Sequence, residues 1–295
     1  MAVMLELSRT VRFCLSDPTT ADAVGAPRAT PRHNTFASWP AMRGLGRYYE
    51  LAVRCRGEAD PDTGCIINVK CIDQAVRDHV LPYLEDLLAH SARPARAPLG
   101  DLMRRLITLL QPALGGRVVQ VQFQFTPTYR LQIRSRAMDH VILKQQYDFS
   151  AAHRLHIETL SDEENHRIFG KCNNLAGHGH NYRVEVAVRV VIDHTGSTLD
   201  VEEIDAIVAA NVIEKLDHKH LNTDVSQFAK LNPSVENIAK VVWTMLDAPL
   251  SRLDTATPAQ LEAVSVWETE KTVCTYLGPR TADDEIGAVR AAACR

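Results

Sequence analysis

Three histidines in the second half of the chain have the spacing of a metal site. His178 and His180 are separated only by Gly179, so on a β-strand their imidazoles would lie side by side on one face. His153 ends the preceding apolar stretch and could reach the same point if the two strands pair antiparallel. Three nitrogen ligands with one open position are the pattern of catalytic zinc, which polarises a bound oxygen. Hydrogen-bonded structural histidines are the alternative.

A single cysteine lies close to these histidines in the sequence. Cys172 sits in the Gly- and Asn-rich run GKCNN, next to Lys171 and outside any apolar stretch. A free thiol is only a few per cent thiolate at neutral pH, and a neighbouring cation or metal raises that share, so the thiolate can act as a base or nucleophile. The alternative is a small, unreactive packing residue.

Two further motifs carry acid and base groups. Asp217 and His218 are adjacent in LDHKH where a helix is expected to end, and they could form an acid/base pair only if the chain turns there. Simple capping is the alternative for such residues at a helix end. Glu268 lies in VSVWETE near the end of an expected strand, on the opposite face from Trp267. Its carboxylate could accept hydrogen bonds from a ring N–H and an amino group, or could simply be solvated.

The elements that must position these residues follow from the hydrophobic pattern. Alternating or apolar stretches predict strands, and apolar residues at helical spacing after a capping signal predict helices. The expected strands are 141–155, 181–192, 261–268 and 272–277, and the expected helices begin at Asp200 and Asn232. Strands at both ends with helices between them favour an antiparallel sheet covered on one face by helices, an α+β fold.

The first half of the chain repeats this plan. At an offset of 132 residues, Gly64 matches Gly196 and Leu84 matches Leu216, each within a strand, turn and helix. The expected elements are strands at 5–15, 48–55, 118–125 and 128–134 and helices at 72–88 and 99–110. Two copies of one domain explain the repeat most simply.

Composition and charge exclude several classes of protein. The 295 residues are 45% hydrophobic and 23% charged, which excludes a disordered chain. The sequence contains no run of about 20 apolar residues, so we expect neither a membrane span nor a secretory signal. Neither half has the basic stripe of a nucleic-acid-binding protein, although residues 1–140 carry 18 Lys and Arg against 13 Asp and Glu. Seven scattered cysteines argue for reduced thiols. We expect a cytoplasmic protein.

The second half resembles the 6-pyruvoyltetrahydropterin synthase family from about Gln146 to Leu277. The motifs that carry the resemblance are FSAAHRL, SDEEN, FGKCNN, GHGHNY, LDHKHLN, the Pro-x-x-Glu-Asn of residues 233–237 and the WET of residues 267–269. The resemblance implies the tunnelling fold, in which the sheets of several copies join into a barrel with active sites between copies. It therefore also implies a homo-oligomer.

The resemblance also implies roles for individual residues. It makes His153, His178 and His180 the ligands of one Zn²⁺ per chain and Cys172 the general base. Asp217 and His218 become a proton-relay pair. The substrate-binding residues would be Glu268, Ser234 and Glu236, with Glu268 anchoring the pterin ring, and Mg²⁺ would accompany the substrate triphosphate.

The implied reaction is a zinc-dependent lyase reaction on 7,8-dihydroneopterin triphosphate that gives 6-pyruvoyltetrahydropterin and triphosphate. The related branch of the family, 6-carboxytetrahydropterin synthase of queuosine biosynthesis, uses the same substrate. The five residues between Cys172 and His178 resemble the pyruvoyl branch, since the carboxy branch typically has three. A non-catalytic pterin- or zinc-binding protein is the remaining alternative.

The first copy lacks this chemistry, because Leu45 to Tyr48 replace the His-Gly-His run, Glu85-Asp86 replaces Asp217-His218 and Phe125 replaces Glu268. We therefore expect tandem tunnelling-fold domains, each with a four-stranded antiparallel sheet and two helices on one face. Residues 1–138 would be a silent copy, residues 139–279 the catalytic domain and residues 280–295 a flexible tail.

Overall fold

The computed structural model describes residues 3–15, 47–90, 98–253 and 258–279. The tail expected at 280–295 lies outside these ranges. So do residues 45–46, which stand in the first copy where the second has part of its His-Gly-His run. The chain divides into two compact units: unit 1 is Met1–Gln146, Val188–Glu203 and Leu253–Ala259, and unit 2 is Tyr147–Ala187, Ile204–Arg252 and Gln260–Arg295. The domain boundary expected at residue 138 stays a prediction.

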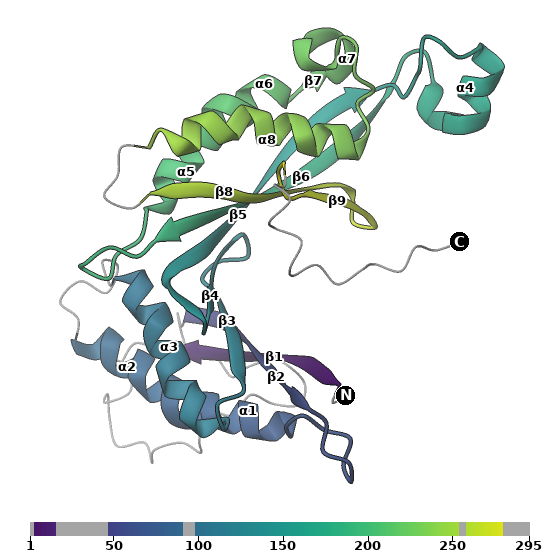
Figure 1. Cartoon of the computed structure of the whole chain (residues 1–295). Coiled ribbons are helices and arrows are strands. Elements are labelled where there is room, and N and C mark those ends of the chain that lie inside the picture. Colours follow the sequence, from purple (N-terminus) through teal and green to yellow (C-terminus); the bar gives the residue numbers. More distant parts are fainter. Residues whose placement is uncertain (1–2, 16–46, 91–97, 254–257, 280–295) are drawn as a thin grey trace, which may run out of the picture. The chain divides into compact units, whose positions relative to one another are not determined.

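Unit 1 holds an antiparallel sheet covered by helices. The strands β1 (Met4–Leu15), β2 (Arg47–Glu58), β3 (Val118–Gln124), β4 (Tyr129–Arg134) and the first part of β5 (Ala137–His153) pair in this order. The helices α1 (Val69–Ala75), α2 (Leu81–His90) and α3 (Leu99–Ala113) lie together on one side of β1–β4 (Figure 1). Alternate strand residues such as Leu51 and Val53 are fully buried, as are Met103 and Leu106 of α3, so the core forms between sheet and helices.

Unit 2 repeats this order of elements around the end of β5. Strands β5, β6 (His178–Val191), β8 (Ala259–Thr269) and β9 (Thr272–Tyr276) are neighbours in the sheet, and α8 (Val235–Ser251) lies along it (Figure 1). The predicted hairpin is present as β8 and β9, with Val264 opposite Tyr276. Fully buried residues from β6 and α8, among them Val184, Val186, Ile238 and Leu246, fill the space between sheet and helix.

Unit 2 also has elements that the hydrophobic pattern did not predict. A short helix, α4 (Asp162–Phe169), begins at a capping box formed by Ser161 and Glu164. The two-residue strand β7 (Lys219–His220) pairs in parallel with β5, and α7 (Leu221–Asp224) follows it. The single helix expected from Asp200 is α5 (Val201–Val208), a π-helical segment (Ala209–Ile213) and α6 (Glu214–Leu216). No helix of the described residues is long and apolar enough to cross a membrane.

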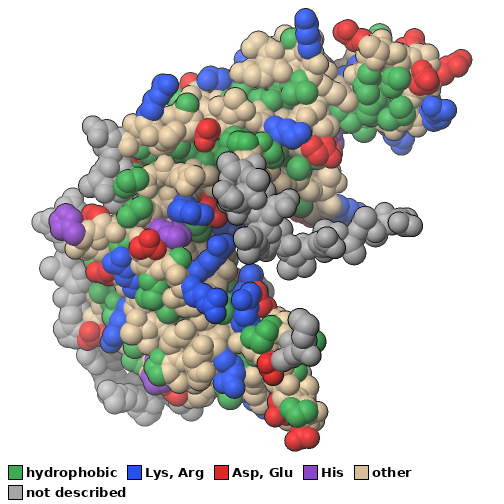
Figure 2. Space-filling model, in the orientation of Figure 1, with side chains coloured by type: hydrophobic (Ala, Val, Ile, Leu, Met, Phe, Trp, Pro, Cys, Tyr) green, Lys and Arg blue, Asp and Glu red, His purple; other side chains and the backbone are tan. Residues whose placement is uncertain are grey.

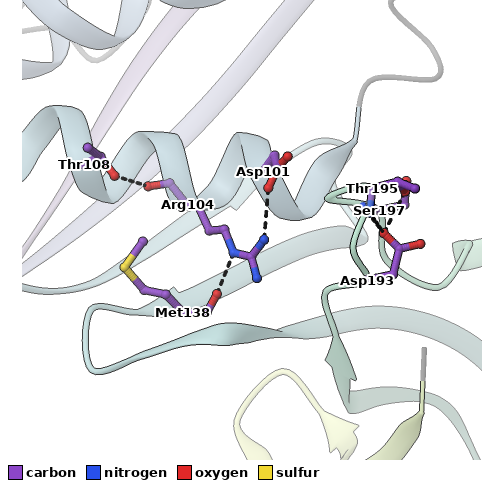
Figure 3. Close-up of polar contacts among 7 residues, drawn as sticks. All are labelled: Asp101, Arg104, Thr108, Met138, Asp193, Thr195 and Ser197. Carbon is purple, nitrogen blue, oxygen red and sulfur yellow. Dashed lines mark hydrogen bonds and ion pairs between the residues drawn. The ribbon is translucent and has the colours of Figure 1, made fainter. Parts of the chain in front are cut away.

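Two turns of unit 1 share one design. In the first turn Asp60 Oδ1 accepts the backbone N–H of Thr63, and in the second Asp193 Oδ1 accepts those of Thr195 and Ser197. A glycine with positive φ follows in each, Gly64 at 68° and Gly196 at 79°. The second turn meets the start of α3, where the Asp101 N–H donates to the Gly196 carbonyl and Asp101 pairs with Arg104 (Figure 3).

These two glycines give a matched test of the packing around α3. A β-carbon at Gly196 would collide with the Asp101 carboxylate, whereas one at Gly64 would meet nothing within 4 Å. Gly64→Ala should lower the free energy of unfolding by about 1 kcal/mol, the cost of a left-handed alanine. Gly196→Ala should cost about 1–3 kcal/mol more, because the collision adds to the same backbone cost. Urea unfolding of both variants measures the difference, and equal losses would contradict the contact.

Candidate metal centre

The three histidines come from two strands of unit 2. On β5 the alternation of side chains places His153 on the same face as Phe149 and Ala151, and on β6 it places His178 and His180 on the same face as Tyr182. The Nε2 atoms of His153 and His178 are 3.1 Å apart. One ring nitrogen from each of the three side chains lies within 4.8 Å of the others. The structure therefore brings together the three residues that sequence spacing suggested.

Hydrogen bonding fixes which nitrogen of His153 is free for a metal. Its Nδ1 lies 2.7 Å from the carbonyl oxygen of Pro233, and since a carbonyl can only accept, Nδ1 carries the proton and Nε2 keeps its lone pair. The His153 side chain is fully buried. Burial lowers the pKa of His153 to about 4, with smaller contributions from the neighbouring histidines, so the ring is neutral at physiological pH.

The donor set fits a divalent ion such as zinc. Burial also lowers the pKa of His178, so a second ligand is in the neutral form that a metal requires. Among the described residues, His180 Nε2 is a buried nitrogen with no hydrogen-bond partner. An orphaned ring nitrogen beside two further imidazoles is costly in a metal-free core and is satisfied by a bound cation.

Glu268 of β8 reaches the same cluster. Its Oε1 atom lies 3.4 Å from His153 Nε2 and 3.7 Å from His180 Nε2, and its side chain is 21% exposed. Glu268 also lines a cavity of about 680 Å³ together with Ser150 and Asp217. The carboxylate predicted to anchor a ligand is therefore placed between the histidine cluster and an open cavity.

Cys172 lies in a short turn tied to the chain that follows His153. The turn, a 3-10 segment from Gly170 to Asn173, follows α4, and Gly170 has a positive φ of 52°. The Leu155 N–H donates to the Cys172 carbonyl at 2.9 Å, and Arg154 Nε donates to Asn173. The thiol is half-buried. These bonds hold the cysteine turn beside the strand that carries a metal-ligand candidate.

Asp217 and His218 form the pair that required a turn of the chain. α6 ends at Leu216, and His218 is the single non-glycine residue of the described chain with a positive φ, at 56°. His218 Nδ1 lies 2.8 Å from Asp217 Oδ2, and Asp217 Oδ1 accepts the Ser150 N–H at 2.8 Å. That backbone bond, followed by the bond from His218, lowers the pKa of Asp217. The carboxylate therefore orients an imidazole that is 83% exposed.

Ser234 and Glu236 lie at the start of α8. Ser234 is the N-cap residue, and its hydroxyl accepts the Asn237 N–H. A hydrogen bond from the Ser234 hydroxyl is the largest cause that lowers the pKa of Glu236. The same segment supplies the Pro233 carbonyl that holds His153. Its observed link to the histidine cluster is therefore this carbonyl.

Sequence reasoning missed two contributors to this site. The Pro233 carbonyl has no signal in residue type, since any residue has a carbonyl. Tyr182 is fully buried, and its ring lies edge-on against those of His153 and His180, with centroids 6.0 and 5.6 Å apart. Its position two residues after His180 on the same strand face was the signal that could have identified it.

Comparisons with known proteins identify relatives of the second half of the chain. The family model described as 6-pyruvoyl tetrahydropterin synthase matches residues 142–279. A 6-pyruvoyl tetrahydrobiopterin synthase of Drosophila melanogaster is 43% identical over 138 residues, which are 46% of this chain and 79% of that protein. The human protein of the same name is 39% identical over 137 residues, which are 46% of this chain and 90% of that protein.

A solved structure covers the same share of the chain. The 6-pyruvoyl tetrahydropterin synthase of Caenorhabditis elegans is 38% identical, covers 48% of this chain and 96% of its own, and superposes with a TM-score of 0.44. The family assignment rests on sequence identity, because the Drosophila and human relatives are matched over most of their length. Through residues 142–279, the chain belongs to the 6-pyruvoyl tetrahydropterin synthase family.

Proposed function

We propose that this chain is a zinc-dependent lyase that converts 7,8-dihydroneopterin triphosphate to 6-pyruvoyltetrahydropterin and triphosphate. The observation that carries the proposal is the convergence of His153, His178, His180 and Glu268 at one point of a domain of this family. Relatives with 39–43% identity are named as synthases of this kind. The reaction removes triphosphate and shifts hydrogens within the substrate, so it needs no external oxidant or reductant.

The chain's own residues supply binding and proton transfer. Zinc bound by the three histidines would act as a Lewis acid towards the side-chain oxygens of the substrate. Cys172 takes a proton from the substrate side chain, and the exposed imidazole of His218, oriented by Asp217, returns one. Glu268 accepts hydrogen bonds from the pterin ring, and Ser234 and Glu236 belong to the substrate-binding part of the site. Mg²⁺ accompanies the triphosphate.

The first half and the assembly are part of the same proposal. Both halves follow the order of two strands, helices and two strands, and both carry a π-helical segment, at Val76–Val80 and Ala209–Ile213. These shared features support a tandem duplication of the tunnelling fold in which the first copy is silent.

Hydrophobic side chains gather near α4 (Figure 2), where Ile168 and Leu175 are 54% and 81% exposed. Such a patch supports burial against another copy in a homo-oligomer, which we place in the cytoplasm.

Identifying the product tests the function. The full chain, loaded with zinc, is incubated with 7,8-dihydroneopterin triphosphate, and the pterin product is identified by mass spectrometry. We expect 6-pyruvoyltetrahydropterin and free triphosphate. Release of acetaldehyde would instead indicate the 6-carboxytetrahydropterin synthase reaction. Tight pterin binding without any turnover would favour the non-catalytic alternative and reject the proposal.

A further inference from the structure

The histidine cluster contains one polar group that the proposed mechanism does not use. Tyr182 is fully buried, and among the described residues its hydroxyl has no hydrogen-bond partner. The ring is held firmly, since it stacks on Phe149 at 5.1 Å and meets His153 and His180 edge-on. A buried hydroxyl without a partner costs about 1–3 kcal/mol, so its retention at this place requires an explanation.

Glu268 is, conversely, a hydrogen-bond acceptor that lacks a donor at the cluster. A carboxylate can accept about four hydrogen bonds. At the cluster, Glu268 Oε1 lies 3.4 Å from His153 Nε2 and 3.7 Å from His180 Nε2. The first of these is not a hydrogen bond, because the proton of His153 is on Nδ1, where it binds the Pro233 carbonyl. Two acceptors therefore face each other, and the carboxylate lacks a donor at the cluster.

The unpaired donor and this carboxylate meet the same two rings. Tyr182 packs against His153 and His180, and Glu268 approaches the Nε2 atoms of the same two residues. Burial is the main cause that raises the pKa of Tyr182, and the charges of Glu268 and then Cys172 raise it further. The tyrosine therefore remains a neutral hydrogen-bond donor within the electrostatic range of Glu268.

We propose that Tyr182 is a positioning residue for Glu268: with His153, His178 and His180 holding a metal ion, the Glu268 carboxylate would accept the hydrogen bond of the Tyr182 hydroxyl. The bond fixes the carboxylate in the orientation that binds the pterin ring. This inference rests on the proposed function, because it assigns Glu268 to pterin binding. Tyr182 itself is buried and does not touch the substrate.

A double-mutant cycle tests the proposal. The zinc-loaded Cys172→Ala variant is used as the background so that 7,8-dihydroneopterin triphosphate binds without turnover, and calorimetry measures its affinity. Tyr182→Phe should weaken binding about tenfold in this background, the loss of one hydrogen bond to a charged group. The same change should have almost no effect once Glu268→Ala is present, because alanine has no acceptor for the Tyr182 hydroxyl and Tyr182 acts through Glu268. Zinc content should not fall, and the free energy of unfolding of the metal-free protein should not fall either, because the Tyr182 hydroxyl has no hydrogen-bond partner there among the described residues.

Tyr147→Phe is the matched control. The Tyr147 hydroxyl donates to Asp205 at 2.7 Å, so its removal should lower stability and leave substrate affinity unchanged. Unchanged affinity in Tyr182→Phe, or an equal loss with and without Glu268→Ala, would overturn the positioning role. If the Cys172→Ala background does not bind the substrate at all, the proposed function fails, and this result is distinct from an additive cycle in a protein that binds.

Discussion

Replacing Cys172 with alanine is expected to reduce turnover of 7,8-dihydroneopterin triphosphate by about 10²–10⁴-fold, the usual contribution of a general base. The change removes only the sulfur from a half-buried position in the turn between α4 and β6. The turn is held by backbone and Arg154 contacts that do not involve the thiol, so the fold of the turn should persist. Single-turnover kinetics measure the effect, and zinc content and substrate affinity should stay near those of the unchanged protein.

Cys274→Ala is the matched control for this variant. Cys274 is also a half-buried thiol of unit 2, but it lies on β9, outside the histidine cluster, and burial raises its pKa, which disfavours the reactive thiolate. Turnover of Cys274→Ala should remain within about twofold of the unchanged protein, as for a substitution away from the chemistry. Full turnover in Cys172→Ala would remove the cysteine from the mechanism while leaving the lyase activity itself established.

The strands of the site could be predicted from sequence because they follow a simple period. His153, His178 and His180 lie on strands whose alternation is visible in the residue types, and the same alternation puts Glu268 opposite Trp267. The acid/base pair was predicted only conditionally. The structure meets the condition through the positive φ of His218, whose backbone N–H donates to the Ser150 carbonyl, a contact that residue type does not reveal.

Other features carry no hydrophobic period that would reveal them, or depend on contacts between distant residues. The helix α4 is polar over most of its length and is fixed by its capping box and by Asn165, whose side chain bonds to the backbone of Ile157 and Leu160. The hydrogen bond from His153 to Pro233 joins residues 80 positions apart. The π-helical segments interrupt helices whose apolar spacing predicts a regular helix.

Replacing His180 with alanine is expected to release the metal and abolish turnover together. Loss of an outer-shell partner of a metal site costs about 10–100-fold in affinity, so the loss of a ligand should weaken zinc binding by more than about 100-fold. The Nε2 atom of His180 has no hydrogen-bond partner among the described residues, so its removal costs no hydrogen bond at that atom. Zinc per chain is measured by atomic emission after dialysis, with turnover measured on the same sample.

The control for this variant is His194→Ala. His194 is an exposed histidine in the turn after β6, outside the cluster, and its replacement should leave both zinc content and turnover unchanged. Chelator treatment followed by added zinc should restore turnover in the control but not in His180→Ala, because only the control keeps three imidazole ligands. Retention of one zinc per chain in His180→Ala would show that the ion is bound elsewhere, and the convergence of the three rings would then need another explanation, such as mutual hydrogen bonding through water.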